Sequence, residues 1–212
     1  MARRCMLIRR DFRGYTGGHG KFRDYVGHID AHPRWRALVY QAPQSVHDES
    51  NPFDDGVALT EQWEPATADA LLLGGMDWTA LPADLHPGIA IVNLVQGVRH
   101  ADPALPLRAF LRRPAIRVCV SAAVAEAIAA TTEVSGPVLT IPAAVDVARL
   151  TAIACVPMSH DVFIDAVKQP ALGKEVAAWL AAAGLNVRLQ VERRPRADYL
   201  AGMASAVIAV PL

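Results

Sequence analysis

The sequence predicts an α/β protein in which parallel strands are joined by helices. Short apolar, β-branched runs alternate with segments of helical spacing, which is typical of βαβ units. Runs such as Ile89–Val95 and Ile116–Val120 are apolar on both faces, as expected for strands covered on both sides. The chain has 212 residues, of which 52% are hydrophobic and 20% charged, so it can form one large or two small globular domains.

The first elements are a strand, a glycine-bearing loop, a helix and a second strand. Cys5–Arg9 is the strand, and Gly14–Gly20 is the loop that follows it. Apolar residues then recur at helical spacing over about 21–30. Trp35–Tyr40 is the second strand, preceded by a proline that is acceptable at such a boundary.

The middle of the chain predicts a long loop and further buried strands. Residues 41–66 contain Pro, Asn and Asp with little periodicity, which indicates a loop with one short helix at most. Asp69–Leu73 and Ile89–Val95 are strands, and Leu105–Arg112 is helical.

The last elements of this part are two strands around a short helix. Ile116–Val120 is a strand, and Ser121 is placed to cap the helix Ala122–Ala130. Val138–Ile141 closes the block. We expect all six strands to form one mainly parallel sheet.

A second α/β part follows a linker that runs from Pro142 to about His160. Its predicted elements are the strand Asp161–Val167, the helix Ala171–Ala183 with Gly184 as its C-cap, the strand Asn186–Val191, a helix over Arg196–Ala204 and the strand Ala206–Leu212. The terminal run reads as a fully buried strand, and no helix follows it. The sequence therefore predicts a Rossmann-like domain at 1–147 and, at 148–212, a linker with half of a second such domain.

Composition excludes several classes of protein. Lys+Arg and Asp+Glu are both 21, and this balance argues against bulk binding of nucleic acid. The 3 cysteines, Cys5, Cys119 and Cys155, form no metal-ligand spacing, so no metal site is expected. No signal peptide or membrane-spanning run is evident, which favours a cytoplasmic protein.

The segment Gly17-Gly-His-Gly20 is a candidate binding loop. It lies between the first predicted strand and helix, where backbone N–H groups and the positive end of the helix face a ligand. The pattern is not GxGxxG, so a dinucleotide fingerprint is not supported. Glycines between a strand and a helix most often form only a tight turn. Ligands of α/β folds bind at the carboxyl ends of strands, however, and this location favours a functional role for the loop.

The segment Gln96-Gly-Val-Arg-His100 follows another buried strand at the same expected edge. His100 has the chemistry of a general base, and Arg99 suits a phosphate or carboxylate. Gln96 adds an amide to the group. Taken alone, such residues usually form a solvated surface loop.

Further charged residues end other predicted strands. Lys168 directly follows the strand Asp161–Val167 and can reach an anion, although an exposed lysine is the default reading. Residues 192–196 form a local basic patch. Asp11, Asp77 and Asp146 also end strands, but they define no carboxylate pair.

Taken together, these segments resemble a bacterial glycosyltransferase of GT-B fold, in the retaining, glycogen-synthase-like group. The carriers of the resemblance are the Gly17-Gly18 loop, the segments Ile89–His100, Arg117–Ser121 and Thr140–Asp146, and the segments Lys168–Leu172 and Ala206–Leu212. Each motif alone matches the family pattern only loosely. The resemblance rests on the order of these motifs over most of the chain.

The resemblance implies a function and a set of site residues. Such enzymes transfer a sugar from a nucleotide-sugar donor to an acceptor hydroxyl with retention and without a metal or other cofactor. It implies donor-binding roles for Gly17, Gly18 and Lys168, and catalytic roles for Gln96, Arg99 and His100. Family members often have histidine where this chain has Gln96, and their acidic E-x7-E segment would follow the terminal strand.

The resemblance also implies partners, and alternatives stay open beside it. The acceptor is not specified, full-length family members can associate peripherally with membranes, and the half domain is expected to self-associate. A non-catalytic α/β binding or docking module is the second hypothesis, because a fold does not fix a function. A different GT-B-like enzyme with a phosphorylated ligand is the third.

Overall fold

The chain forms two compact units, residues 1–144 and 145–212. The computed structural model describes residues 2–82, 88–144, 156–194 and 196–212. Asp146, Cys155 and most of the predicted linker lie outside the described residues. The sequence prediction placed the boundary three residues later than this division.

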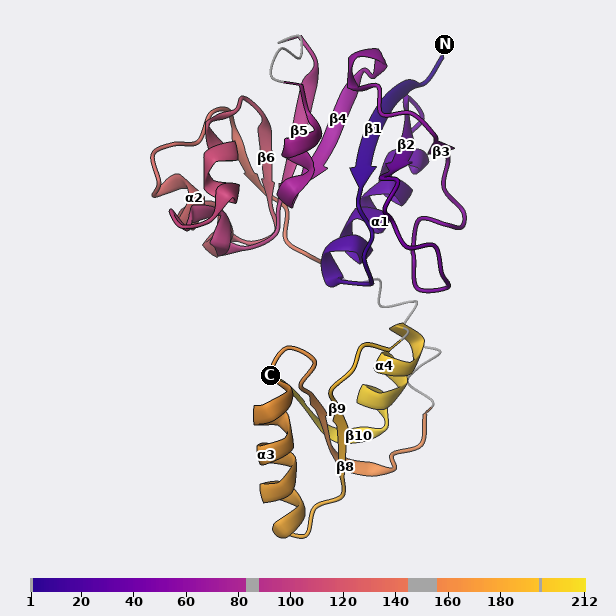
Figure 1. Cartoon of the computed structure of the whole chain (residues 1–212), viewed down its shortest axis with the longest axis vertical. Coiled ribbons are helices and arrows are strands. Elements are labelled where there is room, and N and C mark those ends of the chain that lie inside the picture. Colours follow the sequence, from indigo (N-terminus) through magenta and orange to yellow (C-terminus); the bar gives the residue numbers. More distant parts are fainter. Residues whose placement is uncertain (1, 83–87, 145–155, 195) are drawn as a thin grey trace. The chain divides into compact units, whose positions relative to one another are not determined.

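The first unit is built on a seven-stranded parallel sheet in the order β3-β2-β1-β4-β5-β6-β7 (Figure 1). Its strands are β1 (Arg4–Arg10), β2 (Trp35–Gln41), β3 (Leu59–Thr60), β4 (Ala70–Gly74), β5 (Ala90–Val95), β6 (Ile116–Cys119) and β7 (Val138–Thr140). Every described pairing in this sheet is parallel. The predicted single parallel sheet is therefore confirmed, and β3 is a short strand within the segment predicted as a loop.

Helices cover both faces of this sheet. α1 (Gly17–Ala31) packs through Phe22 and Val26 on the face that carries Ile8 and Leu72. The opposite face carries η2 (Gly75–Ala80), η4 (Pro106–Arg112) and α2 (Ala122–Ala129). Two short 3-10 segments, η1 (Pro65–Thr67) and η3 (Val98–Ala101), complete the unit. This arrangement is compatible with a Rossmann-like fold.

Most predicted helices are confirmed, with differences that have local causes. Ser121 caps α2 as expected, since its Oγ accepts a hydrogen bond from the Val124 amide at 3.3 Å. The segment Pro106–Arg112 is wound as a 3-10 helix, and its end is held by the buried guanidinium of Arg117. Arg117 Nη1 also donates to Asn93 Oδ1 at 2.7 Å, so this arginine is part of the core.

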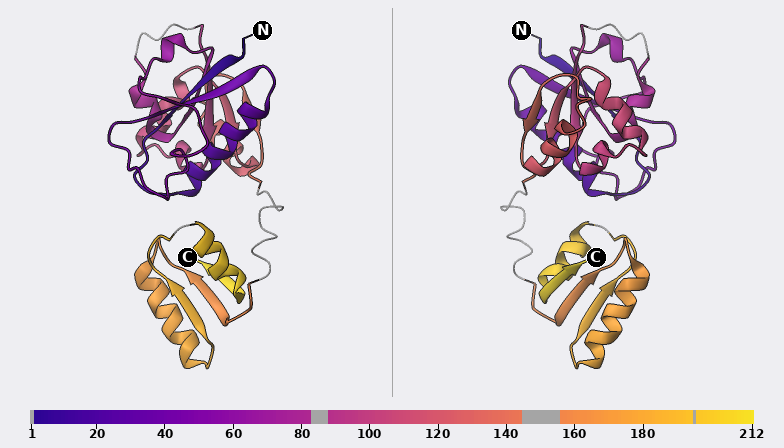
Figure 2. Two further views of the ribbon diagram at one scale, coloured as in Figure 1. Left: turned by 90° about the vertical axis from the view of Figure 1, so that its right-hand side faces the viewer. Right: turned by 90° about the vertical axis from the view of Figure 1, so that its left-hand side faces the viewer.

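The second unit contains the three-stranded parallel sheet β10-β8-β9. Its elements are β8 (His160–Asp165), α3 (Pro170–Ala182), β9 (Val187–Gln190), α4 (Arg196–Ala204) and β10 (Ala206–Pro211). Figure 2 shows α3 on one face of the sheet and α4 on the other. α3 ends in a Schellman motif, in which Gly184, at φ +85°, and Leu185 donate their N–H groups to carbonyls of the last turn.

The terminal strand differs from its prediction. β10 was expected to be fully buried, but Val207 is 65% exposed and Ile208 is 56% exposed. The cause is its place in the sheet: among the described strands β10 pairs with β8 alone and is therefore an edge. Pro211, which has no N–H to donate, is suited to such a strand.

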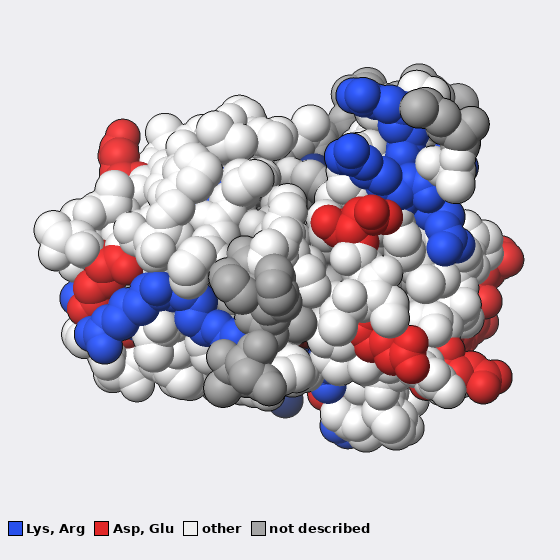
Figure 3. Space-filling view, turned by 90° about the horizontal axis from the view of Figure 1, so that it is seen from above, with Lys and Arg blue, Asp and Glu red and all other residues white. Residues whose placement is uncertain are grey.

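Arginines gather at the amino ends of β1 and β2. Arg3, Arg4, Arg34 and Arg36 are all exposed, and the parallel register places Arg4 beside Trp35 and Cys5 beside Arg36. No ion pair involving these four arginines is found within the described residues. Figure 3 looks onto this end of the first unit and shows a group of blue side chains at its right. We call these four residues the arginine patch.

Candidate functional site

The candidate site lies at the carboxyl edge of the sheet in the first unit. The strand order runs one way from β1 to β3 and the other way from β4 to β7, so the topological switch point falls between β1 and β4. Ligands of open α/β sheets bind outside the carboxyl ends of the strands at such a point. The segments after β1, β4 and β5 meet here.

The glycine segment is the first turn of α1, which corrects the prediction of a loop. Thr16 is the N-cap, with extended backbone at φ −136°, and its Oγ1 accepts a hydrogen bond from the His19 amide at 3.3 Å. This capping overcomes the low helix propensity of three glycines. The positive φ values near this edge belong to Gly14 and Gly75, and none is found at Gly17 or Gly18.

Side chains around this turn fix its position. The ring of His19 packs edge-on against Phe12 at 5.0 Å, and its Nδ1 lies 3.0 Å from Thr16 Oγ1. The amide of Phe12 donates to Ser45 Oγ at 3.1 Å, which ties the segment after β1 to the segment after β2. The hydroxyl of Tyr15 occupies the space of a Cβ on Gly20, so a larger residue there would displace the tyrosine side chain.

Gly18 and Gln96 are brought together by the fold. A Cβ on Gly18 would lie 3.3 Å from Gln96 Oε1, which is tight for any side chain larger than hydrogen. The first N–H groups of a helix have no partner within the helix, and its positive end attracts anions. The turn therefore offers backbone donors beside an amide side chain.

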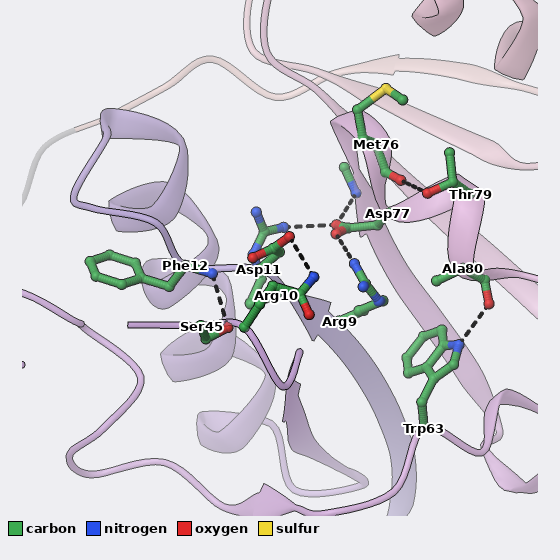
Figure 4. A network of polar contacts seen from close by, with 12 residues as sticks. Arg9, Arg10, Asp11, Phe12, Ser45, Trp63, Met76, Asp77, Thr79 and Ala80 are labelled. Carbon is green, nitrogen blue, oxygen red and sulfur yellow. Dashed lines mark hydrogen bonds and ion pairs between the residues drawn. The ribbon is translucent and has the colours of Figure 1, made fainter. Parts of the chain in front are cut away.

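Arg10 and Asp77 form a buried ion pair at the same edge (Figure 4). Arg10 Nη1 lies 2.9 Å from Asp77 Oδ2, and Arg9 Nη1 lies 3.6 Å from Asp77 Oδ1. The Gly74 amide donates to Asp77 Oδ2 at 3.0 Å. Asp77 thus gathers two guanidinium groups from adjacent positions at the end of β1.

The guanidinium of the ion pair packs against the ring of Phe22, near the start of α1. The guanidinium carbon of Arg10 lies 3.9 Å from the centre of the Phe22 ring, and Phe22 follows Gly18 by one helical turn. The space beside Gly74 is filled by the same ring. Asp11 also lies close to this pair and is itself bonded to Arg13, so three arginines and two aspartates gather here and leave a net positive charge next to the positive end of α1.

Burial acts against both charges of the pair. It lowers the pKa of Arg10, and the nearby Asp77 opposes that change. It raises the pKa of Asp77, and Arg10, the Gly74 amide and Arg9 oppose that rise. The guanidinium remains protonated, as arginine does in proteins. From the sequence, Asp77 is recognisable only as a residue that ends a strand. Arg9 and Arg10, which end an apolar strand, are the sequence signal for this pair.

Arg99 and His100 lie in η3, just after Gln96. Arg99 is exposed, whereas His100 is 5% exposed, and η3 packs on α2 and η4. Burial, together with the charges of Arg99 and Arg117, lowers the pKa of His100 to about 4. The imidazole is therefore neutral at pH 7, and its catalytic role stays a prediction.

Lys168 belongs to the second unit. It is exposed and lies three residues beyond the end of β8 at Asp165, just before the Gln169 that precedes α3, whereas the sequence predicted a strand that runs to Val167. Its role as a partner of the diphosphate also stays a prediction.

Within the residues that the structure describes, no group of three or more His, Cys, Asp or Glu could hold a metal ion. None of the described helices is long and apolar enough to cross a membrane.

The fold and this edge define the first unit as an α/β domain, compatible with a Rossmann-like fold, that carries an electropositive candidate site. No model of a known protein family, no curated protein and no solved structure matches the chain.

Proposed function

We propose that the chain is a glycosyltransferase, or a fragment of one, that uses a nucleotide-sugar donor. The proposed reaction transfers the sugar to an acceptor hydroxyl with retention, and the leaving group is a nucleoside diphosphate. The observation that carries the proposal is the first turn of α1, where Gly18 lies against Gln96 above the Arg10–Asp77 pair. The order of motifs along the chain, which resembles the GT-B group, supplies the reaction class.

The chemistry of this edge suits a diphosphate leaving group. When the bond between the sugar and the diphosphate breaks, negative charge grows on the diphosphate oxygens, and preorganised donors stabilise it. The amides of Gly17 and Gly18 and the side chain of Gln96 would bind these oxygens. Arg10, held by Asp77, contributes positive charge from below.

A non-catalytic binding module is the second candidate. The observation that favours it is the burial of His100, which is only 5% exposed and so presents little surface to an acceptor hydroxyl. Such a module would bind the same anion at the first turn of α1 without breaking a bond.

Titration calorimetry with UDP, GDP and ADP tests the binding site. Gly18→Val would push a side chain against Gln96, and we expect at least a tenfold loss of affinity. Gly27→Val is the matched control, because it places the same side chain in the same helix at a position with open space around it. Equal affinity in the wild type and Gly18→Val would overturn the site.

Turnover separates the two candidates. NMR of the wild type with UDP-sugars, GDP-sugars and ADP-sugars is expected to show release of the nucleoside diphosphate. Binding without turnover of any donor would favour the non-catalytic module.

A further inference from the structure

An open cavity of about 540 Å³ lies in the first unit beside η4, which packs on η3. It is lined by residues of η4, of the segment before it and of the segment after α2: Pro103, Ala104, Leu105, Pro106, Arg108, Ala109, Arg112 and Glu133. Its volume falls within the range of about 300–1,000 Å³ found for small-molecule sites. The wall combines apolar side chains with two arginines and one glutamate.

The charged groups of the cavity are organised around one carboxylate oxygen. Arg108 Nη2 donates to Glu133 Oε1 at 3.2 Å, and Arg112 Nη2 donates to the same oxygen at 3.1 Å. Arg108 Nη1 also donates to the Ala101 carbonyl at 3.1 Å, which fixes this guanidinium against η3. The two arginines are four residues apart on η4, so the helix itself sets their spacing.

This arrangement leaves hydrogen-bond donors for a ligand. A guanidinium has five N–H donors, and the side chain of Arg112 is 69% exposed although it is bonded to Glu133. The cavity carries two positive charges and one negative charge, so its net charge favours an anion. The hydrogen bonds from Arg108 and Arg112 lower the pKa of Glu133, which keeps the carboxylate ionised and both arginines in place.

We propose that this cavity is a second binding site, which takes a small organic anion. Its phosphate or carboxylate group would lie on Arg112 and Arg108, whose planar guanidinium groups match both anions. The body of the ligand would lie against Leu105, Pro106 and Ala109. The cavity shares no residue with the proposed donor site.

The test is titration of the full chain with three probes, followed by calorimetry and by amide chemical shifts. Inorganic phosphate and glucose 1-phosphate test the phosphate arm, and glucuronate tests the carboxylate arm. We expect saturable binding of at least one probe, with shifts at the amides of Arg108 and Arg112. Absence of saturable binding for all three probes would overturn the proposal.

Four variants locate the binding. Arg112→Ala, at a largely exposed side chain, is expected to lower the affinity at least tenfold, whereas Arg34→Ala, an exposed arginine of the arginine patch, should leave it within twofold. Equal losses of affinity in both variants would mean non-specific attraction and would overturn the site.

Glu133→Gln keeps the shape of the side chain and removes its negative charge, so we expect tighter binding of the anion. A loss of affinity would contradict the electrostatic argument. Gly18→Val should leave this binding intact, which separates it from the proposed donor site.

Discussion

Individual glycines of this chain have opposite effects on stability, and the backbone shows why. Gly136 has φ +104°, and the carbonyl oxygen of Ala115 occupies the space of a Cβ there. Gly27 lies inside α1 with open space around it. The first glycine is required by geometry, whereas the second only weakens a helix.

We therefore expect opposite outcomes for two alanine substitutions. Gly136→Ala should lower the free energy of unfolding by at least ~2 kcal/mol, since alanine is strained at positive φ and would also clash. Gly27→Ala should raise it by roughly 0.5–1 kcal/mol. Urea unfolding followed by circular dichroism measures both, and equal effects of the same sign would contradict the backbone geometry.

His100 is expected to make stability depend on pH. The folded protein holds its pKa at about 4, below the ordinary value of 6.5, so the unfolded chain binds this proton more readily. Stability should be full above pH 6.5 and fall as the pH drops toward 4, by up to about 3 kcal/mol from this residue. Urea unfolding between pH 8 and 4 should show a smaller loss for His100→Gln than for the wild type. The same loss in both proteins would refute this role.

At the scale of elements, local sequence signals correctly predicted the helix ends that are fixed by capping residues. Ser121 marked the start of α2, and Gly184 marked the end of α3, because caps depend on a few neighbouring residues. The start of α1 was missed by four residues, because the Thr16 cap was not recognised. The exposure of β10 was missed because a strand's neighbours in the sheet are set by the whole unit.

The exposed edge of β10 leads us to expect self-association of the chain. Ile208 is 56% exposed on a strand that pairs on one side only within the described sheet, and such edges readily pair with a second copy. Ile208→Lys should weaken association more than tenfold, because burying an isoleucine contributes about 1.5–3 kcal/mol. Light scattering over a range of concentrations measures this change.

Trp179→Lys is the control, because Trp179 is 72% exposed but lies on α3 rather than on the edge strand. It should leave association unchanged. A wild-type chain that stays monomeric at all concentrations would contradict the prediction.

At the scale of the whole molecule, a formal charge of zero conceals an uneven distribution of charge. The arginine patch places four exposed arginines at the amino ends of two neighbouring strands. An anionic membrane surface attracts each basic residue near it by about 1 kcal/mol. This patch is where we would expect the peripheral membrane association that the family resemblance implies.

Sedimentation with vesicles tests that expectation. The wild type should bind vesicles that contain phosphatidylserine and release them at high salt, and Arg3→Ala/Arg4→Ala should bind at least tenfold more weakly. The matched control is Arg193→Ala/Arg194→Ala, which removes two exposed arginines from the second unit. Equal binding to neutral and anionic vesicles would contradict a role for the patch.

The sequence by itself determined the α/β class, the parallel strands and most helix positions, because apolar periodicity and caps are local properties of the chain. It also placed Gly18 and Gln96 at the ends of their predicted elements. Only the tertiary structure decided that these two residues meet, that Arg10 and Asp77 pair beneath them, and that Arg108, Arg112 and Glu133 line one cavity. The physical reason is that strand order and the packing of side chains depend on contacts between residues far apart in the sequence, which no local pattern records.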